Sequence, residues 1–185
     1  MDASLPNPEM NSNCTGWNAW GHHTGVGVQW MTYGYLGSAG FCRIVPDSND
    51  AGVYHVSTTG VIPGGSGTAS IYVHTYDTPA GGEQIQAVLT YLDSASQGLG
   101  SFYGDISTAT SWDQITVTGT APSGSVYVSV GFTTPASYRN YVSFDHASLS
   151  GSAFTELDQL NFVIFLSLFG MFAVIVMKRK IALKE

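Results

Sequence analysis

The sequence is poor in charge, and basic residues are especially scarce ahead of its last segment. Charged residues make up 10% of the chain, and of its six Lys and Arg residues only Arg43 and Arg139 precede residue 178. Ten carboxylates lie between Asp2 and Asp145, so this part of the chain is acidic. An acidic surface repels phosphate backbones and anionic headgroups, which argues against nucleic acid as a partner.

The sequence also lacks the motifs that most often mark an enzyme. The glycines at 64–67 do not have the Gly-x-Ser-x-Gly spacing, and there is no His-Glu-x-x-His or phosphate-binding glycine loop. His22 and His23 would diverge on a strand, so metal binding there needs further ligands. Asp77 and Glu83 flank a glycine turn, but a glycosidase needs two carboxylates in a deep cleft. We therefore expect a protein without catalytic activity.

Cysteine is nearly absent, because Cys14 and Cys42 are the only two in the chain. In an oxidising compartment we expect them to pair, which would stabilise the fold by about 3 to 4 kcal/mol. The alternative is two unpaired, buried thiols. Asn13-Cys14-Thr15 also fits the Asn-x-Ser/Thr sequon, so Asn13 is a candidate N-glycosylation site.

A single long apolar run is present, from Leu160 to Met177, and no ionisable residue interrupts it. As a helix it would extend about 27 Å, close to the thickness of a bilayer core. Lys178-Arg179-Lys180 follows directly. By the positive-inside rule we expect one transmembrane helix at 160–177, a cytoplasmic tail at 178–185 and the preceding domain outside the cell. A buried amphipathic helix is the alternative, but the run has almost no polar stripe.

The start of the chain does not supply a secretion signal. Residues 1–8 have neither the basic nor the apolar region of a signal peptide. Either a leader has been removed, or the protein inserts by its tail and leaves the main domain in the cytosol. We favour the removed leader, because tail insertion would carry the basic cluster across the membrane.

Short runs rich in Val, Ile, Tyr and Thr occupy the chain ahead of the span, separated by turn residues such as Pro122-Ser123-Gly124. About nine strands without a helical pattern indicate an all-β antiparallel sandwich. We place this domain at 1–151 and a short linker at 152–159. The expected strands are 25–35, 41–45, 53–61, 69–76, 85–93, 99–105, 112–118, 126–133 and 141–149.

Alternation along these strands separates an apolar face from a polar and aromatic one. Ile71 and Val73 point to one side of their strand, while Tyr72 and His74 point to the other. Tyr127 and Gln86 likewise oppose apolar neighbours in their own strands. We expect one face to form the core and the other to carry the function.

Several short motifs follow one another in a characteristic order. They are Asn7-Pro8 with Trp17, Gly52-Val53-Tyr54, Ser70-Ile71-Tyr72-Val73, Tyr91-Leu92-Asp93, Trp112-Asp113-Gln114-Ile115-Thr116-Val117, Pro122-Ser123-Gly124 and Val142-Ser143-Phe144-Asp145. This order resembles that of the jelly-roll, galactose-binding-like carbohydrate-binding modules of families four, nine and twenty-two. The resemblance implies a jelly-roll sandwich and a carbohydrate ligand.

The resemblance also implies a structural calcium ion between the first and last strands. Asp145 matches one ligand of that site. The other falls nearest Asn11, with Glu9 two residues earlier, and an amide oxygen can also ligate calcium. The alternative for Asp145 is a surface carboxylate that hydrogen-bonds a nearby turn.

Carbohydrate binding needs aromatic planes for pyranose faces and polar groups for the hydroxyls. We expect the four tryptophans to lie in the core or at its rim, and therefore favour tyrosines as the stacking residues. The alternative is that these tyrosines lie on an unused sheet or at a subunit contact. The candidate carbohydrate-binding residues are Tyr72, His74, Gln86, Tyr103 and Tyr127.

Two functional hypotheses follow. In the first, the protein is a membrane-anchored, lectin-like module that binds glycan or polysaccharide at the cell surface without catalysis. In the second, it is a structural or adhesive subunit that self-associates in a surface layer, filament or envelope. A groove lined by Tyr72 and His74 would favour the first, and a flat face that pairs with a second copy would favour the second.

Overall fold

The fold is described from a computed structural model, which covers residues 2–3, 5, 8–21, 27–32, 38–46, 51–57, 60–75, 84–134 and 141–155. The regular structure in these ranges consists of strands. They are β1 (Asp2–Ala3), β2 (Asn18–Trp20), β3 (Gln29–Thr32), β4 (Gly40–Ile44), β5 (Ala51–Ser57), β6 (Gly60–Val61), β7 (Ser66–Thr75), β8 (Ile85–Leu92), β9 (Gly98–Ser107), β10 (Asp113–Thr120), β11 (Tyr127–Thr134), β12 (Val142–Gly151) and β13 (Phe154–Thr155).

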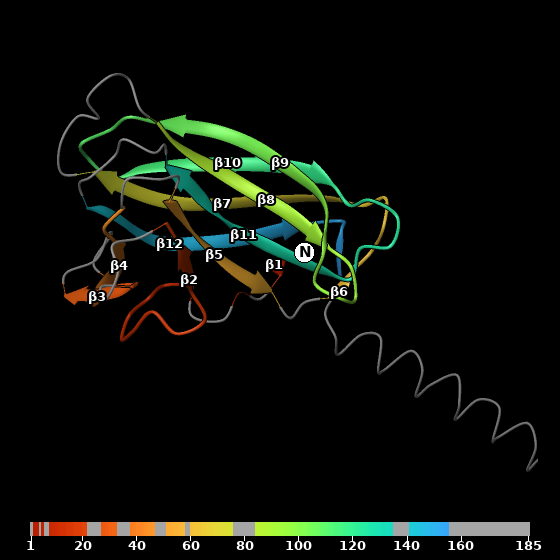
Figure 1. The fold of residues 1–185 in the computed structure, drawn as a ribbon, viewed down its shortest axis with the longest axis horizontal. Coiled ribbons are helices and arrows are strands. Elements are labelled where there is room, and N and C mark those ends of the chain that lie inside the picture. Colours follow the sequence, from red (N-terminus) through yellow and green to blue (C-terminus); the bar gives the residue numbers. More distant parts are fainter. Residues whose placement is uncertain are drawn as a thin grey trace, which may run out of the picture.

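The strands form two antiparallel sheets that pack against each other (Figure 1). Sheet 1 has the order β10-β7-β12-β4-β3, with β1 paired to β12. Sheet 2 has the order β2-β5-β11-β8-β9, and β13 pairs separately with β6. The prediction of an all-β antiparallel sandwich is confirmed.

The core lies between the two sheets and follows the predicted alternation. Along β8, every second side chain from Ile85 to Tyr91 is buried, and the intervening ones are half-buried on the outer side. Phe132 of β11 meets Phe144 of β12 edge to face, with ring centroids 5.5 Å apart, and so joins the sheets. Each such buried side chain stabilises the fold by about 1.5 to 3 kcal/mol.

The N-terminal segment is fastened to sheet 1 by a disulfide and by backbone contacts. Cys14 is bonded to Cys42 of β4, which confirms the predicted pair. The backbone amide of Ala147 donates to the carbonyl of Pro8 at 3.0 Å, at a bulge in β12. This anchoring holds the chain that leads into β2 and thereby positions the edge of sheet 2.

The two sheets also touch at their free edges, where β9 and β10 lie side by side. A Cβ added to Gly104 would lie 2.1 Å from the carbonyl oxygen of Thr116, so the backbones approach closely only because residue 104 is glycine. The carboxylate of Asp105 accepts a hydrogen bond from the Thr116 amide at 3.0 Å. This contact occupies a backbone donor that an edge strand would otherwise expose.

The sandwich extends beyond its expected end at residue 151. Ala153 and Phe154 are buried in the core, and β13 pairs with β6. The first residues of the expected linker are therefore part of the sandwich. The described residues contain no helix long and apolar enough to cross a membrane, and the predicted span at 160–177 and tail at 178–185 lie outside them.

Candidate functional site

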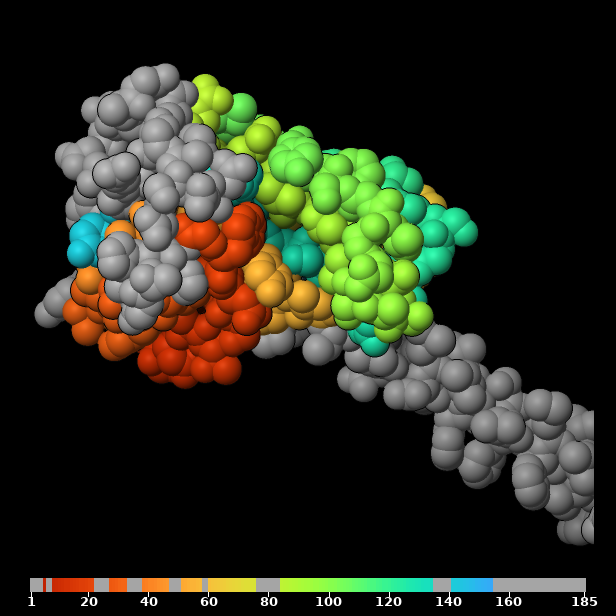
Figure 2. All heavy atoms as spheres, viewed as in Figure 1, coloured from red at the N-terminus to blue at the C-terminus, as the bar shows by residue number. Residues whose placement is uncertain are grey.

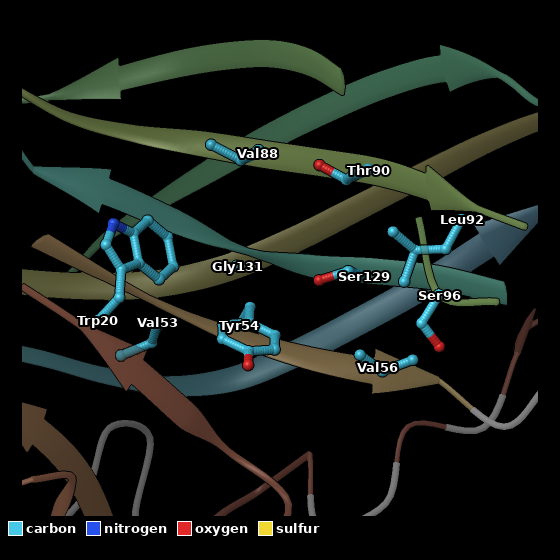
Figure 3. A pocket seen from close by; sticks show the side chains of 10 residues that line it. All are labelled: Trp20, Val53, Tyr54, Val56, Val88, Thr90, Leu92, Ser96, Ser129 and Gly131. Atoms are coloured by element: carbon cyan, nitrogen blue, oxygen red, sulfur yellow. The ribbon is translucent and has the colours of Figure 1, made fainter. Parts of the chain in front are cut away.

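A groove of about 350 Å³ crosses the outer face of sheet 2. Figure 2 shows it as a hollow between the orange atoms of β5 and the green atoms of β8 and β9, with the teal atoms of β11 at its bottom. Its walls therefore come from strands far apart in the sequence. The described residues that line it are Trp20, Val53, Tyr54, Val56, Val88, Thr90, Leu92, Ser96, Ser129 and Gly131 (Figure 3).

Glycine and small hydroxyl residues form the floor of the groove. The register places Gly131 of β11 between Tyr54 of β5 and Val88 of β8. A Cβ at Gly131 would lie 1.8 Å from the carbonyl oxygen of Val53, so any larger residue at position 131 would require the backbone to move. Ser129 lies two residues along the same strand. The absence of a side chain at Gly131 opens the centre of the groove.

Two aromatic rings form one wall. Trp20 of β2 lies opposite Gly52 of β5, and its indole covers the space that a side chain at Gly52 would fill. The Trp20 and Tyr54 ring centroids are 6.0 Å apart and the planes are inclined by 46°. Trp20 is 39% exposed and Tyr54 is 37% exposed, so both rings present area to a ligand.

Aliphatic side chains and a tight turn form the other end of the groove. Val56, Leu92 and Ser96 lie here, away from the Trp20 indole (Figure 3). Ser96 has a left-handed backbone with φ of 61°. The turn that holds it is closed by Asp93, whose carboxylate accepts hydrogen bonds from the amides of Ala95 and Gln97 at 2.8 and 2.9 Å. The position of Ser96 is thus fixed before any ligand binds.

The described residues that line the groove carry no charge. The ten described lining residues include no carboxylate, histidine, lysine, arginine or side-chain amide. The polar groups are the hydroxyls of the tyrosine, serines and threonine and the indole N–H. Thr90 already shares a hydrogen bond of 2.9 Å with Ser101 of β9. Such a surface can stack against an uncharged ligand and make a few hydrogen bonds to it.

Three of the predicted carbohydrate-binding residues lie on the same outer face but outside the set that lines the groove. Tyr103 of β9 pairs with Val88 and is 63% exposed. Tyr127 lies at the start of β11, opposite Leu92. The side-chain amide of Gln86 donates to the carbonyl of Gly104 at 3.3 Å. These three residues therefore share the outer face of sheet 2 with the groove but do not line it.

The other two predicted residues, Tyr72 and His74, lie on β7 in sheet 1, on the opposite side of the sandwich. The Tyr72 ring meets His146 edge to face, with centroids 6.3 Å apart. His74 packs against Trp112 at 5.5 Å, and burial lowers the pKa of the His74 imidazole. The expected groove lined by Tyr72 and His74 therefore does not coincide with the groove on sheet 2.

Trp20, Tyr54 and Gly131 were not predicted from the sequence as site residues. Trp20 was expected in the core or at its rim, whereas it forms the wall of the groove. Tyr54 was noted only as part of a fold motif. The signal that marks it was present, because Tyr54 alternates with the buried Val53 and His55. No comparable signal distinguishes Gly131 from the turn glycines.

Glu9, Asn11 and Asp145, the predicted calcium ligands, all make contacts with protein groups. The buried Asp145 accepts hydrogen bonds from the Ser38 hydroxyl at 2.6 Å and the His146 amide at 2.9 Å. Glu9 meets the His146 imidazole at 2.7 Å. The side-chain oxygen of Asn11 accepts from the Ala39 amide at 3.0 Å.

In the described part of the chain, no group of three or more His, Cys, Asp or Glu residues is placed to hold a metal ion. Calcium binding by Glu9, Asn11 and Asp145 stays a prediction, and the proposed function does not depend on it. Asp145 is buried, so it is not the surface carboxylate of the alternative interpretation.

Asn13, the candidate glycosylation site, is exposed. Its side-chain oxygen accepts a hydrogen bond from the Thr15 amide at 2.9 Å. Glycosylation at this position stays a prediction.

Comparison of the sequence with protein-family models and with curated proteins found no match. Solved structures do resemble the chain. The CBM22-1 and GH10 modules of xylanase 10B from Clostridium thermocellum, solved with xylohexaose, match with a TM-score of 0.64 and 18% identity. That match covers 84% of this chain but only 30% of the xylanase chain.

Two further structures match over nearly their whole length. The CBM22-1 xylan-binding domain of Paenibacillus barcinonensis Xyn10C has a TM-score of 0.56 and 13% identity, covering 78% of this chain and 92% of that domain. A cyclase from Fischerella sp. TAU has a TM-score of 0.61 and 11% identity, covering 84% and 99%. These proteins share the β-sandwich fold with this chain. At such low sequence identities, a shared fold does not indicate a shared activity.

Proposed function

We propose that this protein binds an uncharged saccharide in the groove of sheet 2 and does so without catalysis. The observation that carries the proposal is the pairing of exposed Trp20 and Tyr54 rings with a floor of hydroxyl groups. Aromatic faces supply apolar area for pyranose rings, and the hydroxyls fix orientation. The similarity of the fold to that of a xylan-binding domain also supports the proposal of saccharide binding.

The chemistry of the groove favours binding over catalysis. Glycoside cleavage uses a pair of carboxylates, and acyl transfer uses a nucleophile beside a base. The described lining residues offer neither pair, since they include serine and threonine hydroxyls but no histidine or carboxylate. The cyclase with the same fold gives no reason to expect its activity here, because no catalytic group is recognisable in the groove.

The test is a glycan array followed by titration calorimetry of the full-length chain in detergent, with Tyr54→Ala as the diagnostic variant. We expect Tyr54→Ala to weaken binding at least about tenfold, or 1.4 kcal/mol, because it removes a stacking face from the centre of the site. Tyr72→Ala is the matched control, since Tyr72 is also on an outer face but in the other sheet.

We expect Tyr72→Ala to bind like the wild type. If Tyr72→Ala abolished binding and Tyr54→Ala did not, the site would lie on sheet 1, as the sequence first suggested. If the folded chain bound no glycan, the structural or adhesive subunit that self-associates at the cell surface would become the better hypothesis.

We further propose that the sandwich is held at the cell surface by the predicted transmembrane helix at 160–177, with its C-terminus in the cytoplasm. The disulfide between Cys14 and Cys42 supports an oxidising compartment for the domain. Outside the cell, the groove would meet polysaccharide in the surroundings.

A further inference from the structure

The groove on sheet 2 changes character along its length. The register puts Gly131 and Val88 in one row across the sheet and Ser129 and Thr90 in the next. Trp20 lies beyond the first row, and Leu92 lies beyond the second. An aromatic wall, a hydroxyl row and an aliphatic end therefore follow one another (Figure 3).

Adjacent hydroxyl groups of a sugar would find few partners here. Pairs of vicinal hydroxyls are matched by planar side chains that offer two polar atoms, such as carboxylates, amides and guanidinium groups. None of the ten described lining residues has such a side chain. Two amides lie beside this set, and both donate to backbone carbonyls. Asn18, opposite Tyr54, donates to Gly16 at 3.2 Å, and Gln86 donates to Gly104 at 3.3 Å. A hydroxyl buried without a partner weakens binding.

Aliphatic groups, by contrast, are available. The side chains of Val56, Val88 and Leu92 line the groove and are half-buried. A ligand methyl group that contacts one of these side chains would be removed from water, which favours binding. Their position beside hydroxyl groups suits a ligand that is polar in one part and apolar in another.

Charge restricts the ligand further. An ionised sugar, such as a uronic acid, would lose hydration in the groove without gaining a cationic partner among the described lining residues. The chain also has a formal net charge of −7, which repels anions. An uncharged ligand meets neither penalty.

We propose that the groove selects uncharged saccharides in which a methyl-bearing group replaces a free hydroxyl, as in a 6-deoxyhexose or an O-acetylated sugar. This specificity rests on the proposed function, because it assigns a ligand class to the same groove. Val88 is the residue that determines it, and the hydroxyl of Ser129 in the next row orients the rest of the ring.

Two matched pairs of probes test the proposal by calorimetry on the full-length chain. The first is methyl α-L-fucopyranoside against methyl α-L-galactopyranoside, which differ only by the hydroxyl on C6. The second is acetylated xylo-oligosaccharide before and after alkaline removal of its acetyl groups. We expect the fucoside, the acetylated oligosaccharide or both to bind at least about tenfold more tightly than the other member of the pair. One methyl-sized group commonly gives discrimination of this size.

A preference in one pair supports the proposal and identifies the deoxy sugar or the ester as its source. If the fucoside and the acetylated oligosaccharide bind no more tightly than their partners, this specificity is overturned. The proposed function still stands in that case, provided that some saccharide binds. Failure of every saccharide on an array to bind overturns both.

Variants locate the preference within the groove. Val88→Thr keeps the shape and β-branching of the side chain but replaces a methyl group by a hydroxyl, so we expect the ratio of the two affinities to fall towards one. Val126→Thr is the control, because Val126 is also exposed but does not line the groove. An unchanged ratio in Val88→Thr, with the fold intact by thermal unfolding, contradicts the assignment.

Discussion

His55 is a buried histidine on the inner side of β5. It is 3% exposed and meets the Trp17 ring edge to face at 5.4 Å. Among the described residues, neither of its ring nitrogens has a hydrogen-bond partner. Burial lowers the pKa of His55, opposed only by the nearby backbone of Val56. The neutral form is therefore the one that the folded protein accommodates.

This makes stability depend on pH. Above about pH 6.5, His55 is neutral in both the folded and the unfolded chain, and its titration has no effect. Below that pH, the unfolded chain takes up a proton that the buried ring does not. The free energy of unfolding should then decrease, by about 1.4 kcal/mol for each unit by which the pKa is lowered, until the folded pKa is reached.

Urea unfolding of the wild type and of His55→Leu between pH 7.5 and pH 5 measures this contribution. We expect the decline to be shallower in His55→Leu, because the group responsible is missing. The pKa of His74 is also lowered by burial, and His74 remains in both proteins, so part of the decline will persist. Curves that stay parallel over the whole range would show that His55 does not titrate differently on folding.

At the scale of elements, the contact between β9 and β10 depends on a single glycine. A Cβ at Gly104 would lie 2.1 Å from the Thr116 carbonyl oxygen and 2.6 Å from the Cα of Val117, both of which are backbone atoms. Gly104→Ala should separate the two edges and lower the free energy of unfolding by about 1 to 3 kcal/mol.

Gly98→Ala in the same strand is the matched control. The nearest atom to its added Cβ is a methyl group of Thr90 at 3.8 Å, an ordinary contact. We expect that variant to stay within about 0.5 kcal/mol of the wild type. Equal effects of the two substitutions in urea unfolding would mean that glycine is needed in β9 for another reason than the close approach.

Strand positions were largely predictable from the sequence, because alternation and turn residues are local signals. β8 was expected at 85–93 and spans Ile85–Leu92. The exceptions are short. β2 lies outside the expected strands, and its three residues are too few to show a period. The expected strand at 53–61 is described as β5 and β6, which pair with different partners.

At the scale of the whole molecule, the pairing of strands decided the site, and the sequence could not supply it. A period of two residues tells which side chains point away from the core but not which sheet they belong to. Tyr72 and Tyr127 both point outward as expected, yet they lie on β7 and β11 in different sheets. Only the order of strands in sheet 2 brings Trp20, Tyr54 and Gly131 together.

The orientation of the whole chain across a membrane can be tested through its disulfide. Cys14 and Cys42 are bonded in the structure, and such a bond persists outside the cell but is reduced in the cytosol. We expect the full-length chain, taken from intact membranes under acid quench and treated with a maleimide-linked polymer, to show no mass shift unless it is first reduced. Cys14→Ala/Cys42→Ala gives the unlabelled reference. Two adducts without prior reduction would place the sandwich in the cytosol, as tail insertion requires, and would contradict a removed leader.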